Sequence, residues 1–469
     1  MNSDFTVKVR TSEGAWETVA TYLVKVDEVI AGHTPQNSSL ACFDFAGSVD
    51  VSVTFNRGSL ESVRVRPLSF GITPKMNGNT ITFSLTEPRD LSVEINGDIF
   101  HNLQLFANPI ETNRPFATDT NVIYFGPGMH RIDLGTLTVP TGKTVYIAGG
   151  GIVRGQLICN HVENVRILGR GMIFGSESSP AARSVNSTNV VRSRGGVAIV
   201  NSTNIIVSGI VIVPNGNTIL VGNSRNVTIE NIKSISCGPN YDGIDIFCSS
   251  NVVIEGVFMR NSDDCIAIYG HRRNFYGNTQ NITVGNSTLW ADVAHPILVG
   301  THGDTPNPDT LEDLEFSNLD ILDQMEPQID YQGCMSLNAG DGNLIRNVRF
   351  ENIRVEDFRQ GQLVNLRVFY NRKYNTSPGR GIENIYFKNI TYNGSHSDHS
   401  VIAGYDEGRM VRNVVFEDLV INGTLITDQM RKPSWYKTSD MARFFVGEHV
   451  DGIEFRGRGE APPAITTGR

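Results

Sequence analysis

The chain has 469 residues, 39% of them hydrophobic and 19% charged, which is a globular composition long enough for more than one domain. Its 46 glycines follow no collagen period, and its apolar content is too high for a disordered protein. Forty basic against 49 acidic side chains give a formal net charge of -9, and this balance disfavours nucleic acid as a partner.

The first 30 residues lack a basic stretch followed by an apolar one, so they do not resemble a signal peptide. We therefore expect a cytoplasmic protein as the sequence stands, or a secreted or periplasmic one if a leader has been removed. No run reaches the roughly 18 apolar residues of a membrane span, which disfavours a membrane as a partner.

The six cysteines are sparse, and most lie inside apolar patterns, which predicts small buried thiols rather than disulfides. Neither a Cys-x-x-Cys pair nor a paired Cys/His spacing indicates zinc. We expect no metal and no cofactor, and the oligomeric state stays open.

Residues 1–105 contain short runs in which every second residue is apolar, separated by glycine, asparagine and proline. This alternation predicts a separate antiparallel β-sandwich domain. Residues 106–115 contain two prolines and little periodicity, which is typical of a linker. Three roles are open for the sandwich: it binds glycan, it packs against the rest of the chain, or it caps the N-terminal end of the rest of the chain. The sequence patterns do not distinguish these roles.

From residue 116 to 469 the chain repeats a pattern, usually Asn followed by two β-formers around one free position. The ten copies lie 22 to 40 residues apart, so a rung of about 22 residues carries insertions of different length. Because no amphipathic helix separates the copies, they predict a right-handed parallel β-helix, with each Asn at a tight turn and bonded to its neighbours along the ladder. The copies begin at Asn164, Asn204, Asn226, Asn251, Asn281, Asp313, Asn347, Asn384, Asn413 and Gly452.

Two acidic segments interrupt the apolar pattern one rung apart. The first, residues 240–246, contains Asp242 and Asp245, and the second, residues 261–268, contains Asp263 and Asp264. Asp242 and Asp263 are 21 residues apart, so we expect them to stack on neighbouring coils about 4.8 Å apart, at the floor of an open cleft. If the strand alternates regularly, Asp245 faces away from the side that Ile244 and Ile246 share. We therefore assign it only a supporting role in the site.

Three crowded carboxylates, those of Asp242, Asp263 and Asp264, raise at least one pKa and so supply a protonated acid beside an ionised base. Glycoside hydrolysis needs such a pair, separated by roughly 6.5–9.5 Å in an inverting enzyme. His295 follows on the next coil and is a candidate hydrogen-bonding partner of the acids. Tyr269, Trp290 and Tyr331 are candidates for stacking on sugar rings.

These residues resemble glycoside hydrolase family 28, the polygalacturonase family of pectin-lyase-like β-helices, and more distantly family 49, the dextranase and isopullulanase group. The family's Asn-Thr-Asp-Gly matches residues 240–243, its Asp-Asp matches residues 263–264, and its Gly-His-Gly resembles residues 294–296. The resemblance implies inverting hydrolysis of an α-linked polysaccharide or oligosaccharide. It further implies that Asp263 is the general acid, that Asp242 and Asp264 hold and activate water, and that His295 tunes the acid.

Three departures separate the chain from the family pattern. Tyr241 replaces the Thr, Ala294 and Pro296 replace the glycines beside the histidine, and no Arg-Ile-Lys occurs near residues 333–340 to grip a substrate carboxylate. Candidate substitutes for these cations are His271, Arg272, Arg273, Arg367, Arg372 and Lys373. The residues predicted to bind substrate are Asn240, Tyr269, His271, Arg272, Arg273 and Arg367.

Several functions remain open at this point. The missing Arg-Ile-Lys favours a neutral glucan over a uronate as the carbohydrate partner. A polysaccharide lyase on the same fold would use Ca²⁺ and a strong base, which is disfavoured because no basic residue lies among the acids in the sequence. A non-catalytic glycan-binding solenoid would leave the acids as surface decoration, whereas crowded acids with shifted pKa values more often mark a functional site.

Overall fold

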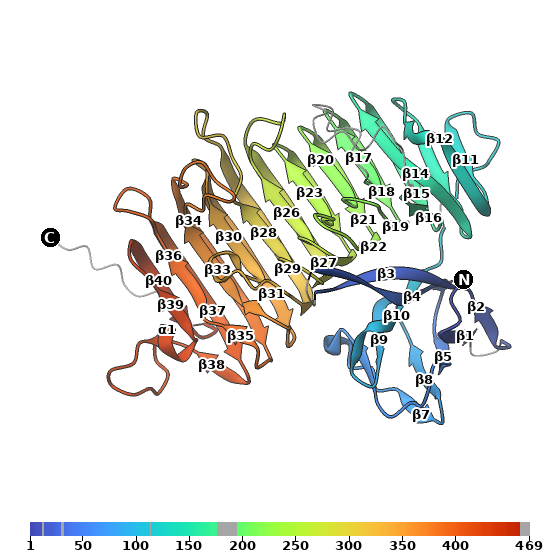
Figure 1. The fold of residues 1–469 in the computed structure, drawn as a ribbon, viewed down its shortest axis with the longest axis horizontal. Helices are drawn as coiled ribbons and strands as arrows, with labels where there is room; N and C mark the ends of the chain where they lie inside the picture. Colours follow the sequence, from blue (N-terminus) through green and yellow to red (C-terminus); the bar gives the residue numbers. More distant parts are fainter. Residues whose placement is uncertain (12–13, 30–31, 113, 176–194, 460–469) are drawn as a thin grey trace.

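A computed structural model describes residues 1–11, 14–29, 32–112, 114–175 and 195–459. It has two parts, an N-terminal β-sandwich and a long parallel β-helix, and the sandwich lies beside the flank of the helix (Figure 1).

The sandwich consists of two five-stranded sheets. Its apolar core includes Val51, Val53, Ile81 and Phe83, which confirms the predicted alternation. One pair of neighbouring strands, β4 and β10, is parallel rather than antiparallel, and β10 runs four residues past the predicted boundary at 105. The first sheet contains β2 (Glu17–Val19), β1 (Phe5–Thr11), β5 (Val49–Phe55), β8 (Thr80–Leu85) and β7 (Lys75–Asn77), and the second contains β3 (Thr21–Val29), β4 (His33–Phe45), β10 (Asp98–Pro109), β9 (Arg89–Ile95) and β6 (Val63–Arg66).

The β-helix confirms the predicted fold, and its rungs build three parallel faces. The ladder sheet contains the Asn copies and comprises β11 (Val122–Phe125), β13 (Thr144–Ile147), β15 (Glu163–Gly169), β18 (Thr203–Ser208), β21 (Arg225–Glu230), β24 (Ser250–Glu255), β27 (Thr279–Ala291), β29 (Thr310–Asp323), β31 (Leu344–Val355), β34 (Gly381–Tyr392), β37 (Val411–Ile421) and β40 (Val450–Arg456). The flank sheet comprises β16 (Met172–Phe174), β19 (Val211–Val213), β22 (Lys233–Ile235), β25 (Phe258–Asn261) and the C-terminal parts of the long strands from β27 onward.

The third face, the site sheet, comprises β12 (Gly128–Thr138), β14 (Gly151–Asn160), β17 (Val197–Val200), β20 (Ile219–Gly222), β23 (Ile244–Phe247), β26 (Ile266–Tyr269), β28 (Ile297–Gly300), β30 (Met335–Ala339), β33 (Val364–Val368), β36 (Ser400–Ala403) and β39 (Phe444–Val446). The first halves of β12 and β14 extend into the flank sheet. Smaller elements are β32 (Gly361–Gln362), β35 (Ser397–Asp398), β38 (Thr424–Ile426) and α1 (Thr438–Met441). Within the described ranges, no helix is long and apolar enough to cross a bilayer.

Stacked identical side chains stabilise the ladder sheet inside and out. Inside, the rings of Phe316, Phe350, Phe387, Phe416 and Phe455 stack with centroids 4.6–5.0 Å apart. At the predicted turns, six Asn side chains donate to the amide oxygen of the previous rung's Asn at 3.0–3.2 Å. Asn347 donates instead to the carboxylate of Asp313 at 3.0 Å. These asparagines have φ between 54° and 59°, a left-handed conformation that Asn tolerates better than most residues. The predicted structural role of the Asn copies is confirmed.

The sandwich packs on the flank sheet, which is one of the three arrangements that the sequence left open. Apolar side chains of β3, β4 and β10 form one buried cluster with the flank strands, made up of Val24, Val26, Leu40, Phe106, Met172, Val211, Ile235 and Phe258. Buried ion pairs cross the same interface, including Arg66 with Glu356 at 2.7 Å. All six cysteines are free thiols, as predicted, and four of them are buried.

Candidate active site

The acidic residues lie in turns between the flank sheet and the site sheet. Asp242 directly precedes Gly243 and β23, and Asp264 precedes β26 by one residue. Ile244 pairs with Ile266, so this rung has 22 residues and Asp242 aligns with Asp264, one residue away from the predicted partner Asp263. A Cβ added at Gly243 would lie 2.2 Å from the Cys265 carbonyl oxygen, so the Asp-Gly sequence permits this close turn.

The structure brings the three predicted acids together. One carboxylate oxygen from each of Asp242, Asp263 and Asp264 lies within 4.8 Å of the other two. Asp242 and Asp263 are half-buried, whereas Asp264 is buried, so two carboxyl groups face solvent beside a fixed third. Oxygen ligands of this kind would also suit a divalent cation, and these are the residues that could hold one.

His295 fixes the orientation of Asp264 from the next rung. Its backbone N–H and its Nδ1–H both donate to Oδ1 of Asp264, at 3.1 and 2.6 Å, and its Nε2–H donates to the Tyr331 carbonyl oxygen. The Tyr269 hydroxyl donates to the other Asp264 oxygen at 3.4 Å. Asp264 is thus a carboxylate surrounded by donors, while Asp263 accepts the N–H of Asp264 at 3.1 Å.

Burial and mutual repulsion shift the protonation of this cluster. Burial, and then the charges of the neighbouring carboxylates, raise the pKa of Asp242 and of Asp263 well above the usual value. Burial lowers the pKa of His295, but the Asp264 carboxylate outweighs it and the net pKa is about 9. These raised pKa values favour the protonated forms of Asp242 and Asp263, and they keep the His295 ring charged at neutral pH.

Asp245 belongs to the cluster more closely than the sequence indicated. Because Ile244 and Ile246 face the interior, Asp245 faces outward on the site sheet, where it is buried and its pKa is raised to about 7, mainly by burial. The side-chain amide of Asn217 donates to both Asp242, at 3.1 Å, and Asp245. Sequence analysis missed Asn217, although it occupies the corresponding turn one rung before Asp242.

Cationic residues reach the acids through the turn after β26. Arg272 and Phe275 exchange two backbone hydrogen bonds of 3.0 Å, and the Phe275 ring packs on Phe247 on the outer face of the site sheet. This folds Arg272 back over the Tyr269 ring, 5.8 Å from its centroid, where its charge lowers the pKa of Asp242 and Asp245. Arg273 also lowers the pKa of Asp245. The acids therefore have basic neighbours in space, although no basic residue stands within the two acidic motifs of the sequence.

The remaining predicted substrate residues nearest the acids differ in their accessibility. Asn240 is exposed in the turn before Asp242, with a left-handed φ of 56°. Tyr269 is 7% exposed, so it contacts Asp264 through its hydroxyl rather than presenting an open ring face. The His271 backbone N–H donates to Asp309 at 2.7 Å, and its ring contacts that of Tyr276.

Three further candidates are already engaged within the protein. Trp290 is completely buried at the interface with the sandwich, so it packs there instead of stacking on a sugar. Tyr331 is also buried, stacked on Tyr374 with centroids 4.6 Å apart. Arg367 is paired with Asp330 at 3.2 Å. His302, which sequence analysis missed, lies against the Tyr269 ring, and burial followed by Arg272 lowers its pKa to about 3.

A family model covers the part of the chain that contains the acids. The model of the glycosyl hydrolases family 28 matches residues 144–439, which is more than half of the chain and contains every acid of the cluster. The chain belongs to this family.

Individual relatives match over shorter stretches. Endopolygalacturonase B of Aspergillus niger is 28% identical over 170 residues, 35% of this chain and 42% of that protein. Exopolygalacturonase A of the same organism is 30% identical over 153 residues, 29% of this chain and 33% of that protein. The match thus spans less than half the length of either relative.

One solved structure extends the likeness over both parts of the molecule. Dex49A from Penicillium minioluteum superposes with a TM-score of 0.60 at 14% sequence identity, covering 97% of this chain and 94% of that one. This likeness concerns the fold alone.

Proposed function

We propose that this protein is a glycoside hydrolase that cleaves α-glycosidic bonds in a uronate-containing, pectin-type polysaccharide or oligosaccharide. Membership of family 28 and the names of the polygalacturonase relatives support the substrate class. The observation that carries the proposal is the convergence of Asp242, Asp263 and Asp264 within 4.8 Å, with two of the three acids half-exposed.

In the proposed reaction Asp263 is the general acid. It is half-buried and its pKa is raised, so it keeps its proton to a higher pH than an ordinary aspartate and can donate that proton to the departing glycosidic oxygen. Asp242 and Asp264 hold a water molecule whose oxygen attacks the anomeric carbon, and the proton of that water passes to a carboxylate of this pair. His295 orients Asp264 and offsets its charge.

The stereochemistry is proposed to be inverting, as the family resemblance implies. One carboxylate oxygen of each acid lies within 4.8 Å of the other two, which is a shorter distance than the roughly 6.5–9.5 Å that separates the carboxyl groups of most inverting pairs. A third carboxylate supports the single displacement nonetheless, because two acids can hold the water while the third protonates the leaving group.

A substrate carboxylate needs a cation, and Arg272 is the best placed among the described residues. It lies over the Tyr269 ring, and the hydroxyl of that ring contacts Asp264. Its guanidinium group can form paired hydrogen bonds with a carboxylate, which would substitute for the missing Arg-Ile-Lys. Arg367 is less suitable because Asp330 already neutralises it.

The test is hydrolysis of a panel containing polygalacturonate, rhamnogalacturonan and dextran, followed by NMR of the first product formed. We expect new reducing ends from a uronate polymer, with the product's anomeric configuration inverted and no effect of a chelator. Activity on dextran alone would favour the neutral glucan. An ultraviolet-absorbing product, formed by an activity that a chelator abolishes, would establish a lyase. A product that retains the anomeric configuration of the substrate would indicate a double-displacement mechanism in place of the single displacement.

A further inference from the structure

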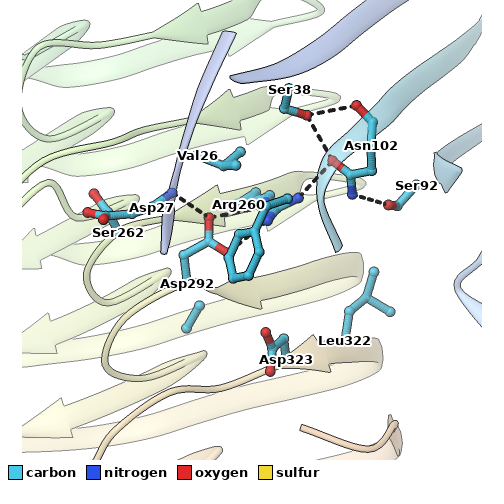
Figure 2. A network of polar contacts seen from close by, with 12 residues as sticks. Val26, Asp27, Ser38, Ser92, Asn102, Arg260, Ser262, Asp292, Leu322 and Asp323 are labelled. Atoms are coloured by element: carbon cyan, nitrogen blue, oxygen red, sulfur yellow. Dashed lines mark hydrogen bonds and ion pairs between the residues drawn. The ribbon is translucent and has the colours of Figure 1, made fainter. Parts of the chain in front are cut away.

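A buried ion pair joins the two turns that position Asp264 and His295. Arg260, at the end region of β25, donates from Nε and Nη2 to the two carboxylate oxygens of Asp292, both at 3.0 Å (Figure 2). Neither side chain has any exposed surface. The pair therefore forms a two-pronged link between successive rungs, fully shielded from water.

This link lies immediately before the reactive residues in both turns. Arg260 is four residues before Asp264, and Asp292 is three residues before His295. The Asp292 backbone N–H also donates to the Asn261 carbonyl at 2.7 Å. The same two turns meet again at the 2.6 Å bond between His295 and Asp264, so the ion pair and the catalytic contact are two connections between one pair of loops.

The sandwich completes this link from the other side. The Asp27 backbone N–H donates to Asp292 Oδ2 at 3.3 Å, and Arg260 Nη1 donates to the Asn102 side-chain oxygen at 3.2 Å (Figure 2). Asn102 is itself held by Ser38 and Ser92. The guanidinium group of Arg260 also lies 3.9 Å from the centroid of the Trp290 ring, and Arg359 bonds the Asp292 carbonyl at 2.8 Å.

Stability alone is a poor explanation for such a pair. The desolvation of two buried charges can cancel their attraction, so well-packed apolar residues often stabilise a fold equally well. An apolar pair does not fix the relative orientation of the two segments that it joins. A guanidinium and a carboxylate joined by two parallel hydrogen bonds fix both the distance and the orientation between their segments.

We propose that Arg260 and Asp292 are positioning residues that hold the Asp264 and His295 turns in register. We call this ion pair the clamp, and we propose that the sandwich contributes to catalysis through its hydrogen bonds to the clamp. The proposal rests on the hydrolase function proposed above. It assigns the N-terminal domain a role inside the catalytic unit, in place of an independent glycan-binding module.

The test compares two charge-neutral double variants at the same interface. Arg260→Met with Asp292→Leu removes the clamp, whereas Arg66→Met with Glu356→Leu removes a buried pair attached to a later, non-catalytic turn. In the control, Glu94 keeps its contact with Arg64. We expect kcat of the clamp variant to fall about 10- to 100-fold with KM changed little, because a small misplacement of reacting groups is costly. The control should keep wild-type kcat, and Arg260→Lys should retain part of it.

An NMR titration of His295 tests the clamp without substrate. His295 faces the carboxyl groups of Asp264 and Glu326, lies within the charge field of Asp263, and donates to the Tyr331 carbonyl. If its turn loosens from Asp264, its pKa should move from about 9 toward the ordinary histidine value, in the clamp variant and not in the control.

Equal kcat losses in the two double variants, or an unchanged kcat and titration in the clamp variant, would overturn the proposal. If the wild-type protein hydrolyses nothing in the panel, the proposed function fails, while the titration still decides whether the clamp positions His295.

Discussion

Single side chains set the charge balance of the site through burial first and through neighbouring charges second. Asp242 and Asp263 have raised pKa values because water is removed from both and because other carboxylates surround them. Asp264 accepts three hydrogen bonds from His295 and Tyr269. The positive charge of Arg272 acts in the opposite direction and lowers the pKa of Asp242, which is half-buried.

Replacement of Arg272 by Gln tests whether this guanidinium binds a substrate carboxylate. We expect KM for a uronate substrate to rise about tenfold or more, the value of one charge-assisted hydrogen bond, with a smaller change in kcat. Steady-state kinetics would measure both constants. Arg367→Gln is the matched control, since its guanidinium is already paired with Asp330. An unchanged KM in the Arg272 variant, or an equal increase in the control, would contradict this role.

At the scale of elements, repeated turns specify the rungs and so align the acids. The ladder asparagines tolerate a left-handed φ, and most of them bond the ladder residue of a neighbouring rung, which keeps successive strands in register. This register places Asp242 opposite Asp264, because each lies two residues before a member of the strand pair Ile244 and Ile266. A one-residue slip would turn every side chain of the strand to the other face.

Asn251 provides a test of the ladder away from the site. Its side chain bonds Asn226 at 3.1 Å and Asn281 at 3.2 Å, at a φ of 54°. Asn251→Ala should lower the free energy of unfolding by about 1–2 kcal/mol, through lost bonds and left-handed strain. Asn251→Gly should cost less because glycine carries no strain at this φ.

Urea denaturation would measure these differences, with the exposed Val253→Thr on the same strand as a near-neutral control. Equal losses for the alanine and glycine variants would show that backbone conformation at this turn is unimportant.

Across the whole molecule, local regularity was predictable from sequence and long-range docking was not. The Asn copies revealed the β-helix, and two acidic segments one rung apart revealed the site, because a solenoid converts sequence spacing directly into proximity. Arg272 could not be placed, since its position depends on Phe275 packing onto Phe247. Nor could the clamp, because Asp27 meets Asp292 across 265 residues with no repeat to relate them.

The proposed function requires that the Asp242, Asp263 and Asp264 cluster performs the hydrolysis. The direct measurement is the turnover of Asp263→Asn on the substrate that the panel identifies, with circular dichroism and thermal unfolding to verify the fold. We predict a loss of at least about 100-fold in kcat, the usual contribution of a general acid, in a normally folded protein.

Asp313→Asn is the control, because it restores the Asn of the other ladder copies and keeps an oxygen for the bond from Asn347. It should retain full activity. Wild-type turnover by a folded Asp263→Asn protein would contradict the assignment of the acid cluster as the catalytic centre.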